Sequence, residues 1–311
     1  MPVPRWTPDT ELSGYVQSTL RLPPDYDGEV TATIVRNDPL VSSPAGAVLY
    51  IHGFIDYFFQ DHVARAFNAR GYDFYALDLR KYGRSLSTRH PNFCKNFDEY
   101  FPEISAALQI MEAEGHARVV LFAHSTGALP AALYAREGTH KARIARLIFN
   151  SPFLDFKEPK WKTRPAALVG SWFPFVRKSN PVNRWYGPSL HSSAKGEWTF
   201  NLRLKPLEGF DAFLGWVHAS AKAHDRVARG LGLPQPILVL HSDRSLDGDR
   251  WSDQFHRADL ILNVDDIARL SPRLGNQVDA VPIAGGKHDL TLSQRDVIPR
   301  VFQVMFDWLD R

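Results

Sequence analysis

The stretch that most constrains this chain runs from Val119 to Gly127, where an apolar run stops at a serine flanked by small residues (VVLFAHSTG). Consecutive apolar residues that include two valines suit a strand buried on both faces. The residues from Gly127 to Tyr134 are typical of a tightly packed helix. The stretch therefore predicts a strand, a sharp turn and a helix, with Ser125 at the turn.

A serine at such a turn is a candidate nucleophile. Its backbone is strained, its hydroxyl stands clear of the sheet, and the next backbone N–H points to where an oxyanion would form. The same short pattern also occurs in ordinary strand-to-helix turns, so the rest of the chain has to decide between the two readings.

Length and composition indicate a globular chain with a large core, because 44% of its 311 residues are hydrophobic. The single cysteine, Cys94, excludes an internal disulfide and a cysteine-rich metal site. A net charge of +3 without a compact basic run gives no indication of nucleic-acid binding. Neither a signal peptide nor a membrane span is present by pattern, so we expect a cytoplasmic protein without stable membrane insertion. The oligomeric state stays open.

Periodicity predicts an α/β fold. Residues 14–22 and 29–37 alternate apolar with polar or small residues, which is typical of an antiparallel hairpin. From residue 45 onward, short apolar runs are separated by helical segments, which favours a mostly parallel central sheet with helices on both faces. The predicted strands of that sheet are residues 46–51, 73–79, 118–123, 145–150, 236–241 and 278–284. Helical stripes begin at Phe101 and at Ile298.

One segment, residues 153–228, interrupts this alternation and reads as an insertion between two parts of the core, residues 1–152 and 229–311. It holds five of the eight tryptophans and carries twelve lysines and arginines against six aspartates and glutamates. We expect a mainly helical cap, or lid, with an aromatic underside. The segment carries a net charge of about +6, which leaves about −3 for the rest of the chain. Because charged residues usually face water, a solvated surface is the ordinary interpretation of this charge.

Two loops after predicted strands have polar or glycine-rich sequences. The first begins His52-Gly53-Phe54, where glycine lets the backbone pass close to a bound group. We expect the backbone N–H groups of Phe54 and Thr126 to hold an oxyanion, and His52 to be a packed turn residue. The second loop, from Asp78 to Ser85, is expected to have a structural role.

The candidate base is His288, which follows a predicted strand and the pair Gly285-Gly286, and precedes the terminal helix. An imidazole titrates near neutrality, so it can take a serine proton and return it to the leaving group. The position also fits the chain order nucleophile, acid, histidine.

The acid is harder to assign, because a long aspartate-rich loop follows the strand at 236–241. Asp243 lies nearest to the strand end, where such an acid normally sits. Asp259 is followed by a helix and one strand before His288, which makes a compact unit. We favour Asp259, with residues 244–258 as an insertion and Asp243 as the alternative.

Together these motifs give the chain a resemblance to the α/β-hydrolase superfamily, in particular to serine esterases of the monoacylglycerol lipase and lysophospholipase kind. The resemblance covers nearly the whole chain. It rests on the His52 loop, the Asp78 loop, the Ser125 turn, the position of the insertion and the His288 loop. Ala123 departs from the usual first glycine of the serine turn, and Lys81 departs from a glycine common in the Asp78 loop.

Within this superfamily the chain also looks like bacterial monoalkyl phthalate hydrolases. A basic, aromatic cap would suit a benzoate ring and its carboxylate, and four cap residues are available for that role: Arg164, Arg177, Lys178 and Arg184.

The sequence therefore predicts a serine carboxylic-ester hydrolase that works through an acyl-enzyme on a small, amphipathic and anionic ester such as a monoalkyl phthalate. Ser125 would attack, His288 would carry the proton and Asp259 would orient the histidine, with no metal or organic cofactor. A monoacylglycerol lipase or lysophospholipase is the alternative within this class. A non-catalytic homologue that binds an apolar ligand is the alternative from another class.

Overall fold

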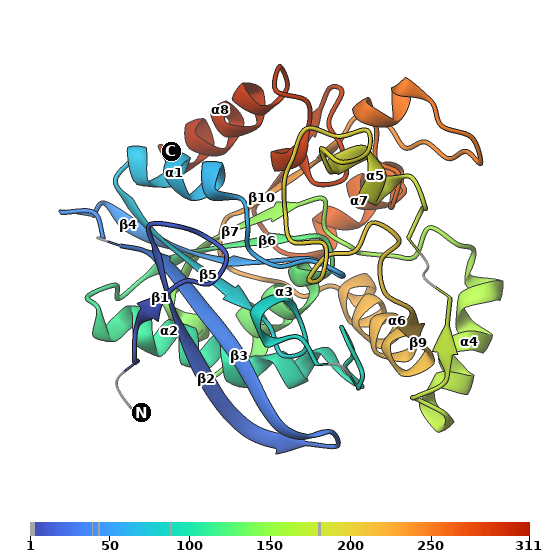
Figure 1. The fold of residues 1–311 in the computed structure, drawn as a ribbon, viewed down its shortest axis with the longest axis horizontal. Helices are drawn as coiled ribbons and strands as arrows, with labels where there is room; N and C mark the ends of the chain where they lie inside the picture. Colours follow the sequence, from blue (N-terminus) through green and yellow to red (C-terminus); the bar gives the residue numbers. More distant parts are fainter. Residues whose placement is uncertain (1–3, 39, 43, 88, 180–181) are drawn as a thin grey trace.

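The computed structural model of the chain describes residues 4–38, 40–42, 44–87, 89–179 and 182–311. Within these residues the main sheet has nine strands, in the spatial order β1-β2-β3-β5-β4-β6-β7-β10-β11 (Figure 1). Their bounds are β1 (Thr7–Pro8), β2 (Tyr15–Asp25), β3 (Gly28–Asn37), β4 (Gly46–Ile51), β5 (Tyr72–Asp78), β6 (Val119–His124), β7 (Ile144–Asn150), β10 (Ile237–Ser242) and β11 (Val278–Ile283).

The predicted parallel sheet is confirmed, with each of its six strands within one residue of the expected bounds. Parallel pairing joins β5 to β4, β4 to β6, β6 to β7, β7 to β10 and β10 to β11. Parallel strands end at the same edge of a sheet, so the loops that follow β4, β6, β10 and β11 gather there. All candidate catalytic residues lie on these four loops.

The predicted hairpin is also confirmed, because β2 and β3 pair in antiparallel register with Ser18 opposite Ile34. Its turn is shorter than expected. β2 continues through the prolines to Asp25 by means of a register shift between Leu22 and Asp25, and Gly28 opens β3 with a φ of 101°. A proline can stand there because the shift removes it from regular ladder pairing.

Alternating residues of the central strands face two separate hydrophobic clusters, which is why these strands are apolar throughout. Helices α1 (Asp61–Ala69) and α8 (Ile298–Leu309) cover one face, and α2 (Phe101–Ala113), α3 (Ala128–Glu137) and α6 (Leu214–Arg229) cover the other (Figure 1). The helical stripes predicted from Phe101 and Ile298 lie in α2 and α8. No helix among the described residues is long and apolar enough to cross a membrane.

The predicted cap, residues 153–228, contributes no strand to the main sheet in its described part. It contains α4 (Lys160–Trp172), α5 (Tyr186–Leu190), most of α6 and a small separate sheet of β8 (Arg177–Lys178) and β9 (Ala212–Phe213). Residues 180 and 181 lie outside the described residues. The expected boundary at 228 falls within α6, whose buried face belongs to the cluster that contains α2 and α3. That this segment acts as a cap stays a prediction.

The aromatic residues of the predicted cap do not all point toward the core, and here the expected aromatic underside is partly wrong. Trp216 is buried, but Trp161 and Trp172 of α4 are 72% and 78% exposed, and Phe173 is 63% exposed. The reason lies in how α4 packs: a Cβ on Gly170 would lie 2.0 Å from the carbonyl oxygen of Leu214, so the small residues of α4 face α6. The large residues are left on the opposite side.

A histidine of α6 predicts a pH dependence of stability. His224 is buried against the rings of Phe153 and Phe156, and its Nε2 lies 3.1 Å from the carbonyl oxygen of Phe153. Burial lowers the pKa of His224 to about 3 from 6.5. Below pH 6.5, His224 is therefore protonated in the unfolded chain but stays neutral in the folded protein. The free energy of unfolding consequently decreases as the pH falls through this range.

At pH 5 the loss from this one residue is about 2 kcal/mol. We expect the melting temperature to fall more between pH 7.5 and pH 5 in the wild type than in His224→Phe, by roughly 4 °C, as measured by thermal denaturation. Equal slopes in the two proteins would contradict a neutral His224. His218→Phe on the same helix is a suitable control, since His218 is only partly buried.

Candidate active site

Ser125 occupies the sharp turn between β6 and α3, as the sequence predicts. Its φ of 50° lies in the left-handed region, which is uncommon for a residue other than glycine. The neighbours must be small: a Cβ on Gly127 would lie 2.2 Å from the carbonyl oxygen of His52, and a Cβ on Gly53 would lie 3.1 Å from the Cβ of Ser125. Ala123 is fully buried and is small enough for the first position of the turn.

Three side chains from three loops form one hydrogen-bonded line. The Ser125 Oγ lies 2.8 Å from His288 Nε2, and His288 Nδ1 lies 2.8 Å from Asp259 Oδ2. All three residues are at most 5% exposed. With its proton on Nδ1, the imidazole donates to the carboxylate and accepts the serine hydroxyl, which is the arrangement that activates a nucleophile.

The structure brings Asp259, rather than Asp243, to His288. The chain leaves β10, makes an excursion that contains one short 3-10 helix (Asp253–Arg257), and returns so that Asp259 pairs with Ser245 in a parallel bridge. The N–H of Leu246 donates to the carbonyl oxygen of Asp259 at 2.9 Å. Asp259 is therefore held beside the end of β10, although many residues separate them along the chain.

Asp243 has a different set of contacts. It is exposed, and its carboxylate accepts the N–H of Gly285 at 2.9 Å. This contact ties the end of β10 to the loop that carries His288, so Asp243 supports the loop without touching the imidazole.

The environment of Asp259 keeps its carboxylate ionised. Burial on its own would raise the pKa of Asp259, but the charge and hydrogen bond of His288 and two backbone N–H groups outweigh it and lower that pKa. The two amides are those of Ile261 and Leu262, which donate to Asp259 Oδ1 at 2.7 and 2.8 Å. One carboxylate oxygen is thus anchored by backbone, and the other is free to accept from the imidazole.

The loop after β4, residues 52–57, lies against the serine turn. Phe54 and Thr126 both line the cavity that contains Ser125 and His288, as a pair of oxyanion donors would. Their role as donors stays a prediction. His52 is a packed turn residue, as expected: its Nδ1 donates to the carbonyl oxygen of Gly53 at 2.8 Å, and its Nε2 accepts the N–H of Leu79 at 3.1 Å.

The loop from Asp78 to Ser85 has the structural role that the sequence predicts. Arg80 binds Glu103 through two hydrogen bonds, of 2.9 and 2.7 Å, and Asp78 accepts from the side chain of Arg84 at 2.8 Å. Lys81, which departs from the usual glycine, has a glycine-like φ of 65°. Its ammonium pairs with Asp27 at 2.5 Å, so the ion pair holds a backbone that a lysine alone disfavours.

The cavity above Ser125 is mostly apolar. Its empty space, including the part that opens to solvent, amounts to about 890 Å³. The rings of Phe54 and Trp216 stack at 4.3 Å, and Trp216 also stacks on Phe153. The other large apolar residues that line the cavity are Ile55, Phe156, Val182, Tyr186, Pro206, Leu207, Ile261 and Leu262.

Four residues with charged side chains line this cavity, two of each sign: Lys157, Lys205, Asp56 and Glu158. Lys157 pairs with Asp247 at 2.7 Å, and Lys205 pairs with Asp56 at 2.5 Å. The four basic residues that the sequence offers for a substrate carboxylate do not line the cavity. They are Arg164, Arg177, Lys178 and Arg184, and all four are exposed. Arg177 instead lines a second cavity, together with Phe210.

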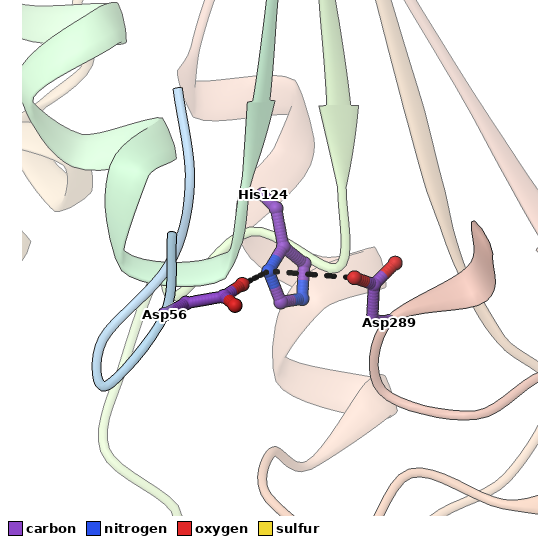
Figure 2. Close-up of side chains that lie close together, drawn as sticks. All are labelled: Asp56, His124 and Asp289. Carbon is purple, nitrogen blue, oxygen red and sulfur yellow. Dashed lines mark ion pairs between the residues drawn. The ribbon is translucent and has the colours of Figure 1, made fainter. Parts of the chain in front are cut away.

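A buried cluster of charged side chains lies behind the serine turn, and the sequence did not predict it. Figure 2 shows His124 between Asp56 and Asp289, with its Nδ1 3.4 Å from Asp56 Oδ2 and 4.0 Å from Asp289 Oδ2. His124 precedes Ser125 and Asp289 follows His288, so the adjacency was visible in the sequence. Only the fold brings them to Asp56.

These three side chains are the one group of potential metal ligands found within the described part of the chain. Their contacts fit a charge network better than a metal site. The ammonium of Lys205 already binds Asp56, and Asp289 Oδ1 accepts from Asn150 at 2.8 Å and from Thr291 Oγ1 at 2.7 Å. The oxygens that face His124 are Asp56 Oδ2 and Asp289 Oδ2, and a divalent cation placed among them would lie close to the ammonium of Lys205.

Comparison with known proteins agrees with this geometry. The sequence model of the Hydrolase_4 family, described as serine aminopeptidase, S33, matches residues 42–247. No curated protein matches the chain in sequence.

Solved structures of lipases and esterases share the fold at low sequence identity. A soluble variant of monoglyceride lipase from Saccharomyces cerevisiae has a TM-score of 0.70 at 18% identity, over 99% of this chain and 97% of that one. A monoacylglycerol lipase from Paleococcus ferrophilus has a TM-score of 0.66 at 18% identity, over 90% and 98%. A thermophilic esterase from Thermogutta terrifontis has a TM-score of 0.60 at 17% identity, over 94% and 98%.

At these identities the structural matches establish the fold, which is that of the α/β-hydrolases. The family match is independent of them and covers 206 of the 311 residues. The chain therefore belongs to the Hydrolase_4 (serine aminopeptidase, S33) family of α/β-hydrolases.

Proposed function

We propose that this hydrolase cleaves carboxylic esters through a covalent acyl-enzyme. The observation that carries the proposal is the hydrogen-bonded line of Ser125, His288 and Asp259 at the bottom of an apolar cavity. The likeness to lipases and an esterase favours an ester over an amide, although the family description names an aminopeptidase.

In the first half of the proposed reaction, Ser125 Oγ attacks the ester carbonyl carbon while its proton passes to His288 Nε2. Asp259 stabilises the resulting imidazolium by accepting the Nδ1–H. The carbonyl oxygen becomes an oxyanion that accepts hydrogen bonds from the N–H groups of Phe54 and Thr126. When this intermediate collapses, the alcohol leaves with the proton from Nε2.

In the second half a water molecule attacks the acyl-enzyme. His288 takes a proton from the water, and a second tetrahedral intermediate forms with its oxyanion in the same place. Its collapse releases the carboxylic acid and returns the proton to Ser125. Apart from this water molecule, the three side chains and two amides supply all the groups that the proposed cycle uses.

For the substrate, we propose a neutral ester with an apolar chain, of the monoacylglycerol type, in place of the anionic phthalate monoester expected from the sequence. The mostly apolar cavity lining and its paired lysines support a neutral ligand. The basic residues meant to attract a carboxylate lie outside this cavity, so the phthalate hypothesis has lost its main argument.

The outer face of α4, together with the residues that follow it up to Val176, also supports a lipid substrate. Of the eight exposed large apolar side chains among the described residues, seven lie between Trp161 and Val176. Residues 157–178 carry six lysines and arginines against one glutamate. Monomeric proteins rarely expose such a patch without a use, and an aromatic face flanked by cations suits the surface of a lipid aggregate.

A substrate panel tests this proposal. We expect the highest kcat/KM on a medium-chain monoacylglycerol, measurable turnover of p-nitrophenyl butyrate, and values at least about tenfold lower on a monoalkyl phthalate and on an aminoacyl p-nitroanilide. Each is measured with the purified full chain by product release. Preference for the phthalate would reinstate an anionic substrate, and preference for the anilide would indicate a peptidase.

The α4 face is tested by the double variant Trp172→Ser/Phe173→Ser. We expect a several-fold lower rate on monoacylglycerol above its aggregation threshold and an unchanged rate on p-nitrophenyl butyrate. Gln303→Ser, at an exposed residue of α8 outside the active site, is the control. If the double variant has the wild-type rate on monoacylglycerol as well as on p-nitrophenyl butyrate, the exposed apolar residues give no support to a lipid substrate.

A further inference from the structure

A turn of the predicted cap, residues 200–205, is docked onto the loop that carries Phe54. Lys205 Nζ donates to Asp56 Oδ1 at 2.5 Å, and the N–H of Asn201 donates to Tyr57 Oη at 2.8 Å. The ammonium of Lys205 also lies 5.2 Å from the centre of the Phe59 ring. An ion pair, a hydrogen bond and an aromatic contact thus join the same two segments.

The loop has a strained backbone, which its surroundings have to hold. Ile55, between Phe54 and Asp56, has a φ of 52°, and a β-branched residue strongly disfavours this conformation. Such a backbone persists only where neighbouring contacts determine it. The contacts of Asp56 and Tyr57 with the 200–205 turn begin directly after the strained residue.

Asp56 touches the serine turn as well as the 200–205 turn. Its Oδ2 faces Nδ1 of His124, the residue before Ser125 (Figure 2). Asp56 is 1% exposed and Lys205 is 6% exposed, so each charge has its main contacts within the protein and little contact with water. Burial alone would raise the pKa of Asp56, but the Lys205 ammonium, followed by His124, holds it well below its usual range.

The charges of this cluster show what Lys205 contributes. Asp56 and Asp289 bring two carboxylates to His124, and Lys205 brings the ammonium that binds one of them. Without it, Asp56 would be a buried carboxylate with only the imidazole beside it, which is a costly arrangement. Relief would come from a shift of the loop toward water, and this loop carries the amide of Phe54.

We infer that Lys205 is a positioning residue for the hydrolytic reaction: by binding Asp56 it couples the 200–205 turn of the predicted cap to the backbone of the 52–57 loop and to His124. The site is therefore complete only when this turn is seated on the loop. The inference rests on the proposed function, because it assigns the Phe54 amide to the oxyanion.

The test compares Lys205→Met with wild type on p-nitrophenyl acetate, a substrate too small to depend on the cap for binding. A misplaced oxyanion donor lowers the rate of the chemical step, so kcat is expected to fall by about 10–100-fold while KM changes by less than about threefold. Lys222→Met, the same substitution at an exposed residue of α6, is the matched control and should retain wild-type kinetics.

Two further variants separate positioning from stability. Lys205→Arg keeps a cation and should recover a large part of kcat. Lys205→Met/Asp56→Asn removes both charges and should be more active than Lys205→Met alone, because no unpaired carboxylate is left. Melting temperatures of all variants are measured in parallel. The inference is wrong if Lys205→Met keeps the wild-type kcat. It is also wrong if kcat is as low in Lys205→Arg and in Lys205→Met/Asp56→Asn as in Lys205→Met.

Failure of the proposed function has a different signature. A fluorophosphonate ester probe should label wild-type Ser125, and the rate of labelling should drop in Lys205→Met in parallel with kcat. If wild type is neither labelled nor active, the proposed function fails. If wild type is labelled and active but Lys205→Met is labelled at the same rate, only the positioning role fails.

Discussion

Ser125→Ala is expected to lower the turnover of p-nitrophenyl butyrate by about five to six orders of magnitude, the largest effect of any single substitution in this chain. The hydroxyl oxygen is the only heavy atom that is lost. Without it, no acyl-enzyme can form and no proton can pass to His288 Nε2. Folding should be unaffected, because alanine fits the same turn and the left-handed backbone at φ 50° does not depend on the hydroxyl.

Hydrolysis is followed by p-nitrophenol release and folding by thermal denaturation. Ser151→Ala is a close control, because Ser151 is also buried, has a φ of 46° and follows β7, the neighbour of β6 in the sheet. It should keep wild-type turnover. Wild-type rates in Ser125→Ala would refute a serine mechanism, and a protein that binds monoacylglycerol without turnover or probe labelling would be a non-catalytic binder.

The second large effect is expected for Asp259→Asn, which should lower kcat by about 10³–10⁴-fold on the same substrate. The asparagine side chain can present an N–H to His288 Nδ1 where the carboxylate accepts one. The imidazole then favours the tautomer with its proton on Nε2, which cannot accept the proton of Ser125. The stabilisation of the imidazolium by a negative charge is lost as well.

Asp243→Asn should lower kcat by less than about tenfold, since an asparagine oxygen can still accept the N–H of Gly285. Because Asp259 Oδ1 also anchors the amides of Ile261 and Leu262, melting temperatures of both variants are needed to exclude a general loss of loop structure. A greater loss of activity in Asp243→Asn than in Asp259→Asn would reverse the assignment of the acid.

The success of the strand predictions has a local cause. Strands of a parallel sheet with helices on both faces are apolar along their whole length, so each appears in the sequence as a short run bounded by polar residues. Val119 to His124 is such a run, and residues 236–241 are another. The serine turn was equally legible, because Gly127 and Gly53 stand where any Cβ would meet the backbone or the nucleophile.

The directions of the side chains in the predicted cap could not be inferred from the sequence in the same way. Trp161 and Trp172 are large and apolar, and hydrophobicity alone places such residues in a core. They are exposed because Gly170 lets α4 approach α6 by its small face, a contact that depends on how two helices cross. For the same reason the sequence could not tell that Arg164 lies away from the cavity.

The sequence by itself determined the fold class, the positions of the strands, and the candidates Ser125 and His288, since each of these depends on residues that are neighbours along the chain. The sequence favoured Asp259 but kept Asp243 as the alternative, and the tertiary structure decided which of them meets His288, because a parallel bridge at Ser245 returns Asp259 to the end of β10. It also decided that Lys205, Asp56, His124 and Asp289 share one buried cluster. Charges so far apart in sequence carry no common pattern, and only the convergence of loops at one edge of the sheet brings them together.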